Sequence, residues 1–183
     1  MSFSRTVLPV LTFLLLLTGV SSCVKDVDLD QTENIKLRPK IQTDLLIFDV
    51  DESDFLDTIT KEFKPVIRDT VRLEFLDDDY IQENLKEVSF SFQYKNSFSH
   101  GFNSTIYFLS ESNHLQHRVD IYLPAAVGTS PTVTEKVEII QEDRIQLVRR
   151  TIKMVVELEA VKGMAPFSGE LKFQSKGLFS MEF

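Results

Sequence analysis

Apolar and polar residues alternate along several stretches of this chain, which is the pattern of a β-strand with one buried face. The clearest example is residues 88–95, where Val88, Phe90, Phe92 and Tyr94 alternate with polar side chains. The same period predicts further strands at residues 71–75, 119–123 and 152–160, and weaker patterns predict strands at 41–49, 103–109 and 132–140. Strands therefore dominate the chain from about residue 41 onward.

The C-terminal segment continues this pattern, because apolar residues of one parity run from Leu171 to Phe183. Ser175 and Gly177 interrupt that face, and we expect a turn or bulge there between two strands. Two short helical turns are predicted at residues 80–86, capped by Asp78 or Asp79, and at 141–150, where Ile145 and Val148 share a face.

About eight short strands in roughly 140 residues are typical of an antiparallel β-sandwich. We predict an immunoglobulin-like, Greek-key sandwich with one or two short helical turns, and a small closed β-barrel is the alternative. The chain has 183 residues, 43% hydrophobic and 26% charged, which fits a single globular domain. Its 15 Phe and absence of Trp indicate a Phe-rich core.

The net charge and the cysteine content argue against nucleic-acid-binding proteins and against proteins built on disulfides or Cys-rich zinc sites. The formal net charge is −8, which argues against nucleic-acid binding, because such proteins need a basic surface to displace counterions from phosphate. One cysteine excludes an internal disulfide framework and a Cys-rich zinc site.

The first 22 residues have the layout of a secretory signal. Arg5 is their only charge, and it precedes an apolar run from Val7 to Val20 that is shorter than the roughly 20 residues a membrane span needs. The run ends in Val20-Ser21-Ser22-Cys23, and Cys23 is the only cysteine. This segment resembles the lipobox of bacterial lipoproteins, which implies cleavage before Cys23 and acylation of its sulfur. Several acyl chains on one residue would hold the protein firmly on a bilayer.

The residues after Cys23 narrow the resemblance. Lys25, Asp26 and Asp28 resemble the C-x-K-D surface-export signal, so the chain is similar to small outer-membrane and cell-surface lipoproteins of the Bacteroidota, of flavobacterial type. The segment Gln93 to Phe98 also resembles a strand-to-turn segment of their sandwich domains. The resemblance implies an outer-membrane location, and the export signal further implies exposure at the cell surface. We therefore expect a signal peptide at 1–22, a lipidated cysteine and flexible tether at 23–40, and one sandwich domain at 41–183.

No candidate catalytic or metal site emerges from the sequence. Two acidic runs, which begin at Asp26 and Asp49, start like calcium-binding loops but lack the required glycine and terminal glutamate. His114 and His117 form the only close histidine pair, and no third zinc ligand is identifiable. The segment 97–101, which contains His100, reads as a hairpin turn. We expect no catalytic residue, no metal and no cofactor.

Two threonines are candidate modification sites. Asp57-Thr58-Ile59 and Asp69-Thr70-Val71 resemble the D-(S/T)-aliphatic O-glycosylation motif of exported proteins in the same bacterial group. Thr58 and Thr70 are therefore possible O-glycosylation sites, and ordinary strand-edge threonines are the alternative.

These observations predict a lipid-anchored, non-enzymatic component of an envelope complex, held on the membrane by acyl chains on Cys23 and bound to an envelope protein partner. One alternative is a carrier of an apolar ligand, with a cavity lined by Phe92, Phe108, Phe173 and Phe179. A second alternative is a surface glycan-binding protein or hydrolase, against which the absence of Trp argues.

Overall fold

The computed structural model describes residues 36–163 and 166–183, and residues 36–183 form one compact unit. Eight strands build this domain: β1 (Lys40–Asp51), β2 (Val66–Arg72), β3 (Leu85–Asn96), β4 (Phe102–Leu109), β5 (Leu115–Leu123), β6 (Thr132–Gln141), β7 (Lys153–Ala160) and β8 (Glu170–Met181). The short helical elements are η2 (Glu52–Phe55), η3 (Glu74–Asp77), α2 (Asp79–Asn84), η4 (Glu142–Arg144) and α3 (Ile145–Arg149).

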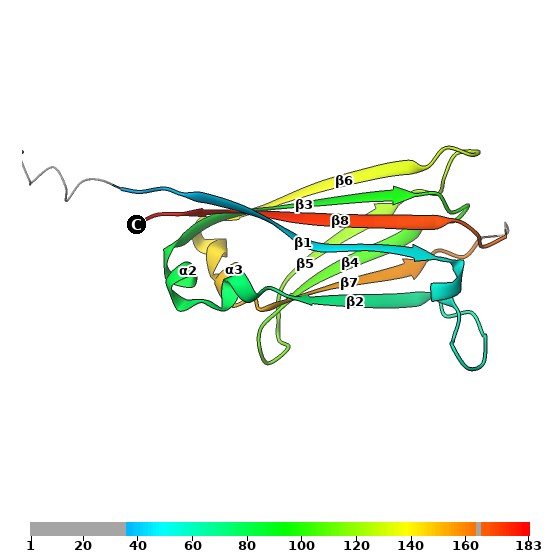
Figure 1. Ribbon diagram of the computed structural model, residues 1–183, viewed down its shortest axis with the longest axis horizontal. Helices are drawn as coiled ribbons and strands as arrows, with labels where there is room; N and C mark the ends of the chain where they lie inside the picture. The colour runs from blue at the N-terminus through cyan, green and yellow to red at the C-terminus, as the bar shows by residue number, and fades with distance from the viewer. Residues whose placement is uncertain (1–35, 164–165) are drawn as a thin grey trace, which may run out of the picture. The chain divides into compact units, whose positions relative to one another are not determined.

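The strands form two antiparallel four-stranded sheets, in the orders β1-β8-β3-β6 and β2-β7-β4-β5 (Figure 1). Six of the seven connections cross from one sheet to the other, and only β4 and β5 are joined as a hairpin. This arrangement is an eight-stranded jelly roll, a sandwich built from two Greek keys. The predicted antiparallel sandwich is confirmed, and the two sheets do not close into a barrel.

Aromatic rings fill the space between the sheets. Phe90 of β3 packs on Phe108 of β4 with ring centroids 4.6 Å apart, so it joins the two layers. Tyr94 packs on Phe173 at 4.6 Å, and its hydroxyl bonds the Ser104 hydroxyl at 2.7 Å. Burial raises the pKa of the Tyr94 phenol above its usual value, and the hydrogen bond from Ser104 opposes this only in part. Tight packing of rings of one parity fixes which face of each strand points inward.

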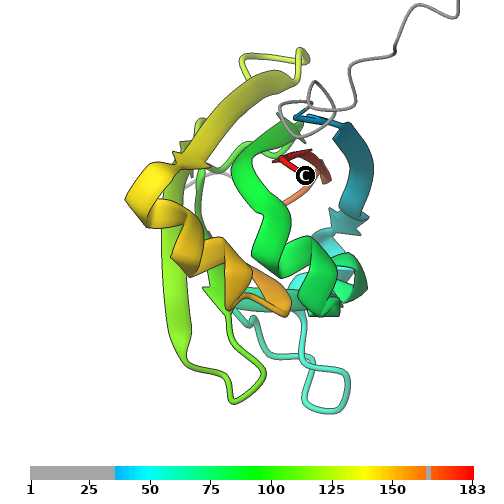
Figure 2. The same ribbon diagram turned by 90° about the vertical axis from the view of Figure 1, so that its left-hand side faces the viewer.

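The antiparallel order gathers the connections at two ends of the domain. One end, here called the loop end, carries the connections 52–65, 97–101, 124–131 and 161–169. The other, here called the helical end, carries η3 with α2 and η4 with α3. Figure 2 looks onto the helical end and shows the two α-helices lying across it. The predicted helical turns are confirmed: Asp78 caps α2 by accepting from the Ile81 amide, and Ile145 and Val148 of α3 are buried.

Both described termini lie at the helical end. Leu37 and Phe183 exchange backbone hydrogen bonds of 3.1 and 2.9 Å, and Glu182 forms ion pairs with Lys36 and Arg38. These contacts lower the pKa of Glu182, with the Lys36 hydrogen bond the largest cause. Residues 36–39 fall in the segment expected to be tether, and the structure pairs them with the C-terminal strand instead. The chain therefore enters the domain at the end opposite the loop end.

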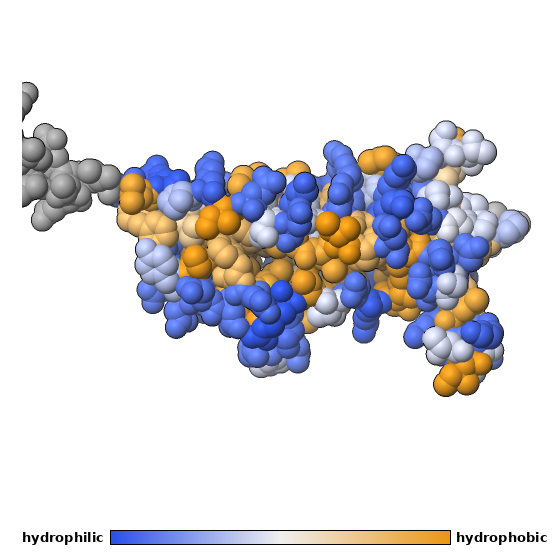
Figure 3. All heavy atoms as spheres, in the orientation of Figure 1, coloured by the Kyte–Doolittle hydropathy of each residue, from blue (hydrophilic) through white to orange (hydrophobic). Residues whose placement is uncertain are grey.

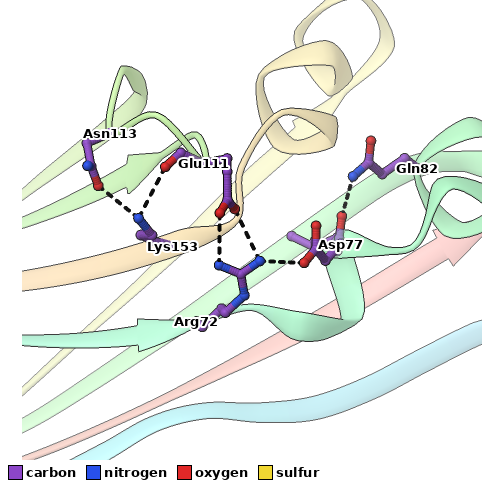
Figure 4. A network of polar contacts seen from close by, with 7 residues as sticks. Arg72, Asp77, Gln82, Glu111, Asn113 and Lys153 are labelled. Atoms are coloured by element: carbon purple, nitrogen blue, oxygen red, sulfur yellow. Dashed lines mark hydrogen bonds and ion pairs between the residues drawn. The ribbon is translucent and has the colours of Figure 1, made fainter.

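A polar network joins four segments at the helical end (Figure 4). Arg72, at the end of β2, pairs with Asp77 of η3 and with Glu111 of the β4–β5 turn. Lys153 of β7 donates to the Glu111 carbonyl and to the Asn113 side chain at 3.2 and 3.0 Å. Hydrogen bonds to these two carboxylates raise the pKa of Arg72. Its half-exposed ion pairs are individually weak, so the network mainly fixes the positions of the turn and η3.

The strand predicted at residues 71–75 is misplaced. The structure places β2 at Val66–Arg72, and the chain then turns into the 3₁₀ helix η3. Leu73 and Leu76 are buried beneath this turn, so residues whose spacing resembles a strand serve a tight helical turn.

The turn predicted at Ser175 and Gly177 is also wrong, because β8 continues from Glu170 to Met181 without a break. The bulge lies in its partner β1, between Asp44 and Ile47. The Ser175 hydroxyl satisfies this bulge by bonding both the amide and the carbonyl of Leu46 at 3.0 Å. Gly177 leaves room for the Phe179 ring, which a β-carbon would approach to 2.5 Å. Both small residues therefore serve packing within one strand.

The bulge predicts unequal effects of two Ser→Ala substitutions in β8. Ser175→Ala removes the partner of the Leu46 amide and should lower the free energy of unfolding by about 1–3 kcal/mol. Ser180→Ala is the matched control, because the buried Ser180 hydroxyl has no hydrogen-bond partner among the described residues. Urea denaturation of both variants measures the difference, and equal losses would contradict this role of Ser175.

Candidate functional site

A hollow of about 800 Å³ lies at the loop end, on the side of the sheet that contains β4 and β7. We call it the loop-end pocket. It is lined by parts of three loops and two strand ends: Phe63, Pro65, His100, Asn103, Glu159, Ala160, Val161, Lys162, Gly163 and Phe167. Its size is that of pockets which bind small molecules, and it mixes aromatic and polar groups as such pockets do.

Two phenylalanines form the aromatic wall of this pocket. Phe63 is 51% exposed, and it meets Phe167 in an edge-to-face contact with centroids 4.9 Å apart. Phe167 also packs on the buried rings of Phe55 and Phe98, at 5.0 and 4.9 Å. These buried rings extend the core to the loop end and hold the exposed wall in place.

His100 lies in the wall of the pocket and is only 7% exposed. Its Nδ1 is 3.1 Å from the Ser99 hydroxyl oxygen, and that hydroxyl donates its hydrogen to the Pro166 carbonyl at 2.6 Å. When the Ser99 hydroxyl donates to Pro166 it accepts from Nδ1, and the neutral ring then carries its proton on Nδ1. Nε2 is then an acceptor, and no described residue bonds to it.

The same geometry does not align Ser99 and His100 as a nucleophile and its base. A general base must accept the hydroxyl proton, whereas here the Ser99 hydroxyl is committed to a carbonyl and the facing ring nitrogen is a donor. Gly163 lies against the other edge of the ring, where a β-carbon would come within 2.8 Å of Nε2. Gly163 therefore allows the loop to approach the ring closely.

Three further polar side chains line the pocket: Asn103, Glu159 and Lys162. Asn103 and Glu159 are direct cross-strand neighbours on β4 and β7, so their side chains share one face of the sheet. Among the described residues, none of the three side chains forms a hydrogen bond or ion pair. Their polar atoms are thus available to a ligand.

The next row of the same face is different, because its polar groups are paired with one another. Arg68 pairs with Glu157, which also accepts from the Tyr107 hydroxyl at 3.3 Å. Arg118 pairs with Asp120 at 2.7 Å, and this contact is the main reason that the pKa of Asp120 is lowered. Of these two rows, only the one at the loop end has side chains without hydrogen-bond partners among the described residues.

A second hollow follows the side of the sandwich where the edge strands β1 and β2 face each other. Its lining includes five partly buried apolar residues: Leu45, Phe48, Ile67, Val71 and Phe75. It comprises about 610 Å³ toward the loop end and about 140 Å³ toward the helical end. We call it the lateral groove, and Figure 3 shows apolar side chains gathered along this side.

On the opposite side of the sandwich, polar and charged side chains cover the gap between the edge strands β5 and β6. Glu138 of β6 accepts from His117 of β5 and from Arg144 of η4, at 3.0 and 3.1 Å. Charged residues turned toward the gap between edge strands protect those edges from further pairing. The two sides of the sandwich therefore differ. Glu138 and its hydrogen-bond partners cover the side of β5 and β6, whereas the side of β1 and β2 exposes apolar surface.

The residues expected to carry the lipid anchor and export signal, Cys23, Lys25, Asp26 and Asp28, lie outside the described residues. Thr58 is exposed in a turn after η2, where the Thr60 and Ile59 amides bond Asp57 and lower its pKa. Thr70 is exposed on edge strand β2. Their modification stays a prediction, and the structure shows that both are accessible.

The acidic run at Asp26 lies outside the described residues, and acidic residues in the described part serve local structure. Asp51 caps η2 by accepting from the amide and hydroxyl of Ser53, which lower its pKa. Asp78 caps α2. Over residues 36–163 and 166–183, the structure contains no group of three or more His, Cys, Asp or Glu that could hold a metal ion.

The loop-end pocket was not predicted from the sequence. Residues 97–101 connect the two sheets rather than form a hairpin, so the predicted turn is wrong in type. The side chain of Asn96 stabilises this connection by bonding the His100 and Pro124 carbonyls at 2.9 and 2.8 Å. The composition of the segment signalled a turn, but nothing in it signalled a buried histidine.

The four phenylalanines proposed to line an apolar cavity are packed instead. Phe92, Phe108, Phe173 and Phe179 are each 1% exposed. Each contacts another ring within 6.5 Å, so they fill the sandwich core. Any apolar ligand would have to bind elsewhere in the described domain.

The fold and site together define a jelly-roll domain with an open, mixed aromatic and polar pocket at one end. No family model matches the chain, and no curated protein matches it. Similar solved structures include the infectious bursal disease virus VP2 subviral particle (10% identity, TM-score 0.40, covering 80% of this chain and 32% of that chain). Tailspike protein 4 of bacteriophage CBA120 is also similar (12%, TM-score 0.37, 78% and 19%), as is an Arthrobacter globiformis isomalto-dextranase complexed with panose (8%, TM-score 0.34, 72% and 23%).

This chain spans about a third or less of the length of those solved chains, and similarities this low carry no information about function. Within the described part of the chain, no helix has the length and apolar character required to cross a membrane.

Proposed function

We propose that this protein is a lipid-anchored, non-enzymatic binding component of the bacterial outer membrane, displayed at the cell surface, which engages an envelope partner through its loop end. The observation that carries this proposal is the placement of the two ends. The chain enters the domain beside Phe183 at the helical end, and the loop-end pocket lies at the opposite end. An anchor at Cys23 would thus leave the pocket facing away from the bilayer.

The chemistry of the domain supports the same function. A net charge of −8 disfavours adhesion to anionic lipid, so the acyl chains would supply the attachment. The open polar groups of Asn103, Glu159 and Lys162 supply recognition, whereas the neighbouring row is engaged in internal pairs. O-glycosylation of Thr58 or Thr70 belongs to the same proposal of an exported protein.

The anchor is tested by Cys23→Ser in the native host. The variant lacks the sulfur that would carry acyl chains, so it should move from the membrane fraction to the soluble fraction. Fractionation and immunoblotting measure the shift, with Ser22→Ala as the control that keeps the cysteine. Membrane attachment that persists unchanged in Cys23→Ser would overturn the anchor.

The binding face is tested by photo-crosslinking on intact cells. A photoreactive residue at Ile59 or Val127 reports on the loop end, because both side chains are highly exposed there, at 88% and 77%. The same residue at Val137, exposed on the outer face of β6, is the control. We expect crosslinked products from Ile59 and Val127 and none from Val137. Products from Val137 alone, or from no position, would contradict loop-end binding.

The lateral groove supports one other function, a carrier of a single acyl chain. Its apolar floor includes Ile67, Val156 and Leu158, and it is open to solvent along its length. An acyl chain there would remove apolar surface from water, which contributes about 25 cal/mol per Å².

Extraction and mass spectrometry of the purified Cys23→Ser protein distinguish the carrier from the binding component. A carrier would retain lipid, and Ile67→Glu in the groove floor would abolish retention, whereas Val137→Glu on the outer face of β6 would not. A lipid-free protein that also binds no added fatty acid would exclude the carrier.

A further inference from the structure

We propose that the loop-end pocket binds a neutral saccharide. This inference rests on the proposed function and assigns the chemical class of ligand to that same site. A sugar ring combines an apolar C–H face with a rim of hydroxyl groups. The pocket presents the complement of both, as an exposed aromatic wall beside a set of hydrogen-bonding groups.

The aromatic wall is suited to a ring rather than to a flexible chain. Phe63 presents half of its surface to solvent, and its contacts with Phe167 and Phe55 fix its orientation. Aromatic rings offer a large contact area at low cost in conformational entropy. The buried rings beneath them reduce that cost further, because the wall is already ordered before a ligand arrives.

The buried histidine is the observation that points most directly to a ligand. His100 is more than nine-tenths buried, lines the pocket, and has an Nε2 acceptor that no described residue satisfies. Nε2 keeps some access to solvent, because the fully buried unpaired side-chain atoms of the described residues are Arg149 Nε and Ser180 Oγ. A ligand that donates a hydrogen can therefore reach Nε2 and form a bond there in place of water. A sugar hydroxyl is such a donor.

The remaining polar groups provide both kinds of hydrogen-bonding partner. The Glu159 carboxylate accepts, the Lys162 ammonium donates, and the Asn103 amide does both. Each sugar hydroxyl is at once a donor and an acceptor, so adjacent hydroxyls can bond such a mixed set. An acyl chain would instead bury these groups without partners, at a cost that its apolar contacts would have to offset.

The balance of charge favours a neutral ligand. Lys162 would attract an anion but Glu159 would repel it, and the reverse holds for a cation. An aromatic wall, mixed donors and acceptors, and no net charge together match a neutral saccharide.

The test uses the full-length protein carrying Cys23→Ser, probed on an array of neutral, anionic and cationic glycans, with affinities then measured by calorimetry. We expect at least one neutral saccharide to bind. Phe63→Ala removes the stacking surface, and Glu159→Gln replaces the carboxylate acceptor with a neutral amide. Each should weaken binding by tenfold or more.

Two variants serve as controls. Val137→Ala removes an exposed apolar side chain on the outer face of β6, and Glu142→Gln removes an exposed carboxylate at the helical end. Both should bind as the parent protein does. Glu159→Gln also guards against misfolding as the cause of lost binding, because this exposed side chain has no partner among the described residues.

Absence of binding to every neutral saccharide would overturn the inference, as would binding that Phe63→Ala and Glu159→Gln both leave unchanged. Retention of charged glycans alone would also overturn it. Loop-end crosslinking to a protein, together with a blank array, would refute the saccharide and leave the proposed function standing. A blank array together with no crosslinked product would refute both.

Discussion

The packing of aromatic rings between two sheets is the constraint on which the rest of this structure depends. Phe90 of β3 meets Phe108 of β4 across the two layers, rings of β3 also meet rings of β8 within one sheet, and these strands contribute their core rings from one parity only. That requirement fixes the inward face of every strand and so prevents slippage of register. Six of the seven connections join one sheet to the other. Loops far apart in sequence are thereby brought together at one end.

The parts of the fold that depend on local periodicity were predictable from the sequence. The alternation at residues 88–95 predicts a strand, and β3 occurs there. Both predicted helical turns also occur where they were expected. The errors arise where one spacing serves two structures. Leu73 and Phe75 have the spacing of a strand, but Leu73 precedes the 3₁₀ helix η3 and Phe75 lies within it. Arg72, the last residue of β2, pairs with Asp77 of this helix. Ser175 and Gly177 suggest a break in the strand. In the structure, Ser175 instead bonds the bulge of β1, and Gly177 makes room for the Phe179 ring.

The candidate site could not be predicted, for a related reason. Its aromatic wall comes from Phe63 and Phe167, which lie about a hundred positions apart in the sequence. No local pattern distinguishes them from the other phenylalanines of a Phe-rich chain. The surroundings of His100 also come from a distant segment, because its ring packs on Phe167 and its neighbour Ser99 bonds the Pro166 carbonyl. The composition of the loop at residues 97–101 can be read from the sequence. The tautomer of His100, and an Nε2 without a partner among the described residues, depend on tertiary contacts.

The two hollows differ in how firmly the fold holds them. The loop-end pocket is built on rings continuous with the core and on a loop whose carbonyls are bonded by Asn96, so its groups are positioned in advance. The lateral groove lies between edge strands that share few contacts, and one of them carries a bulge. Edges of this kind open locally at lower free energy than core strands do. A preorganised site pays less to order its groups on binding, and it discriminates by whether each polar atom is satisfied. Selective recognition is therefore better supported at the loop end, and the groove suits an apolar ligand of undemanding shape.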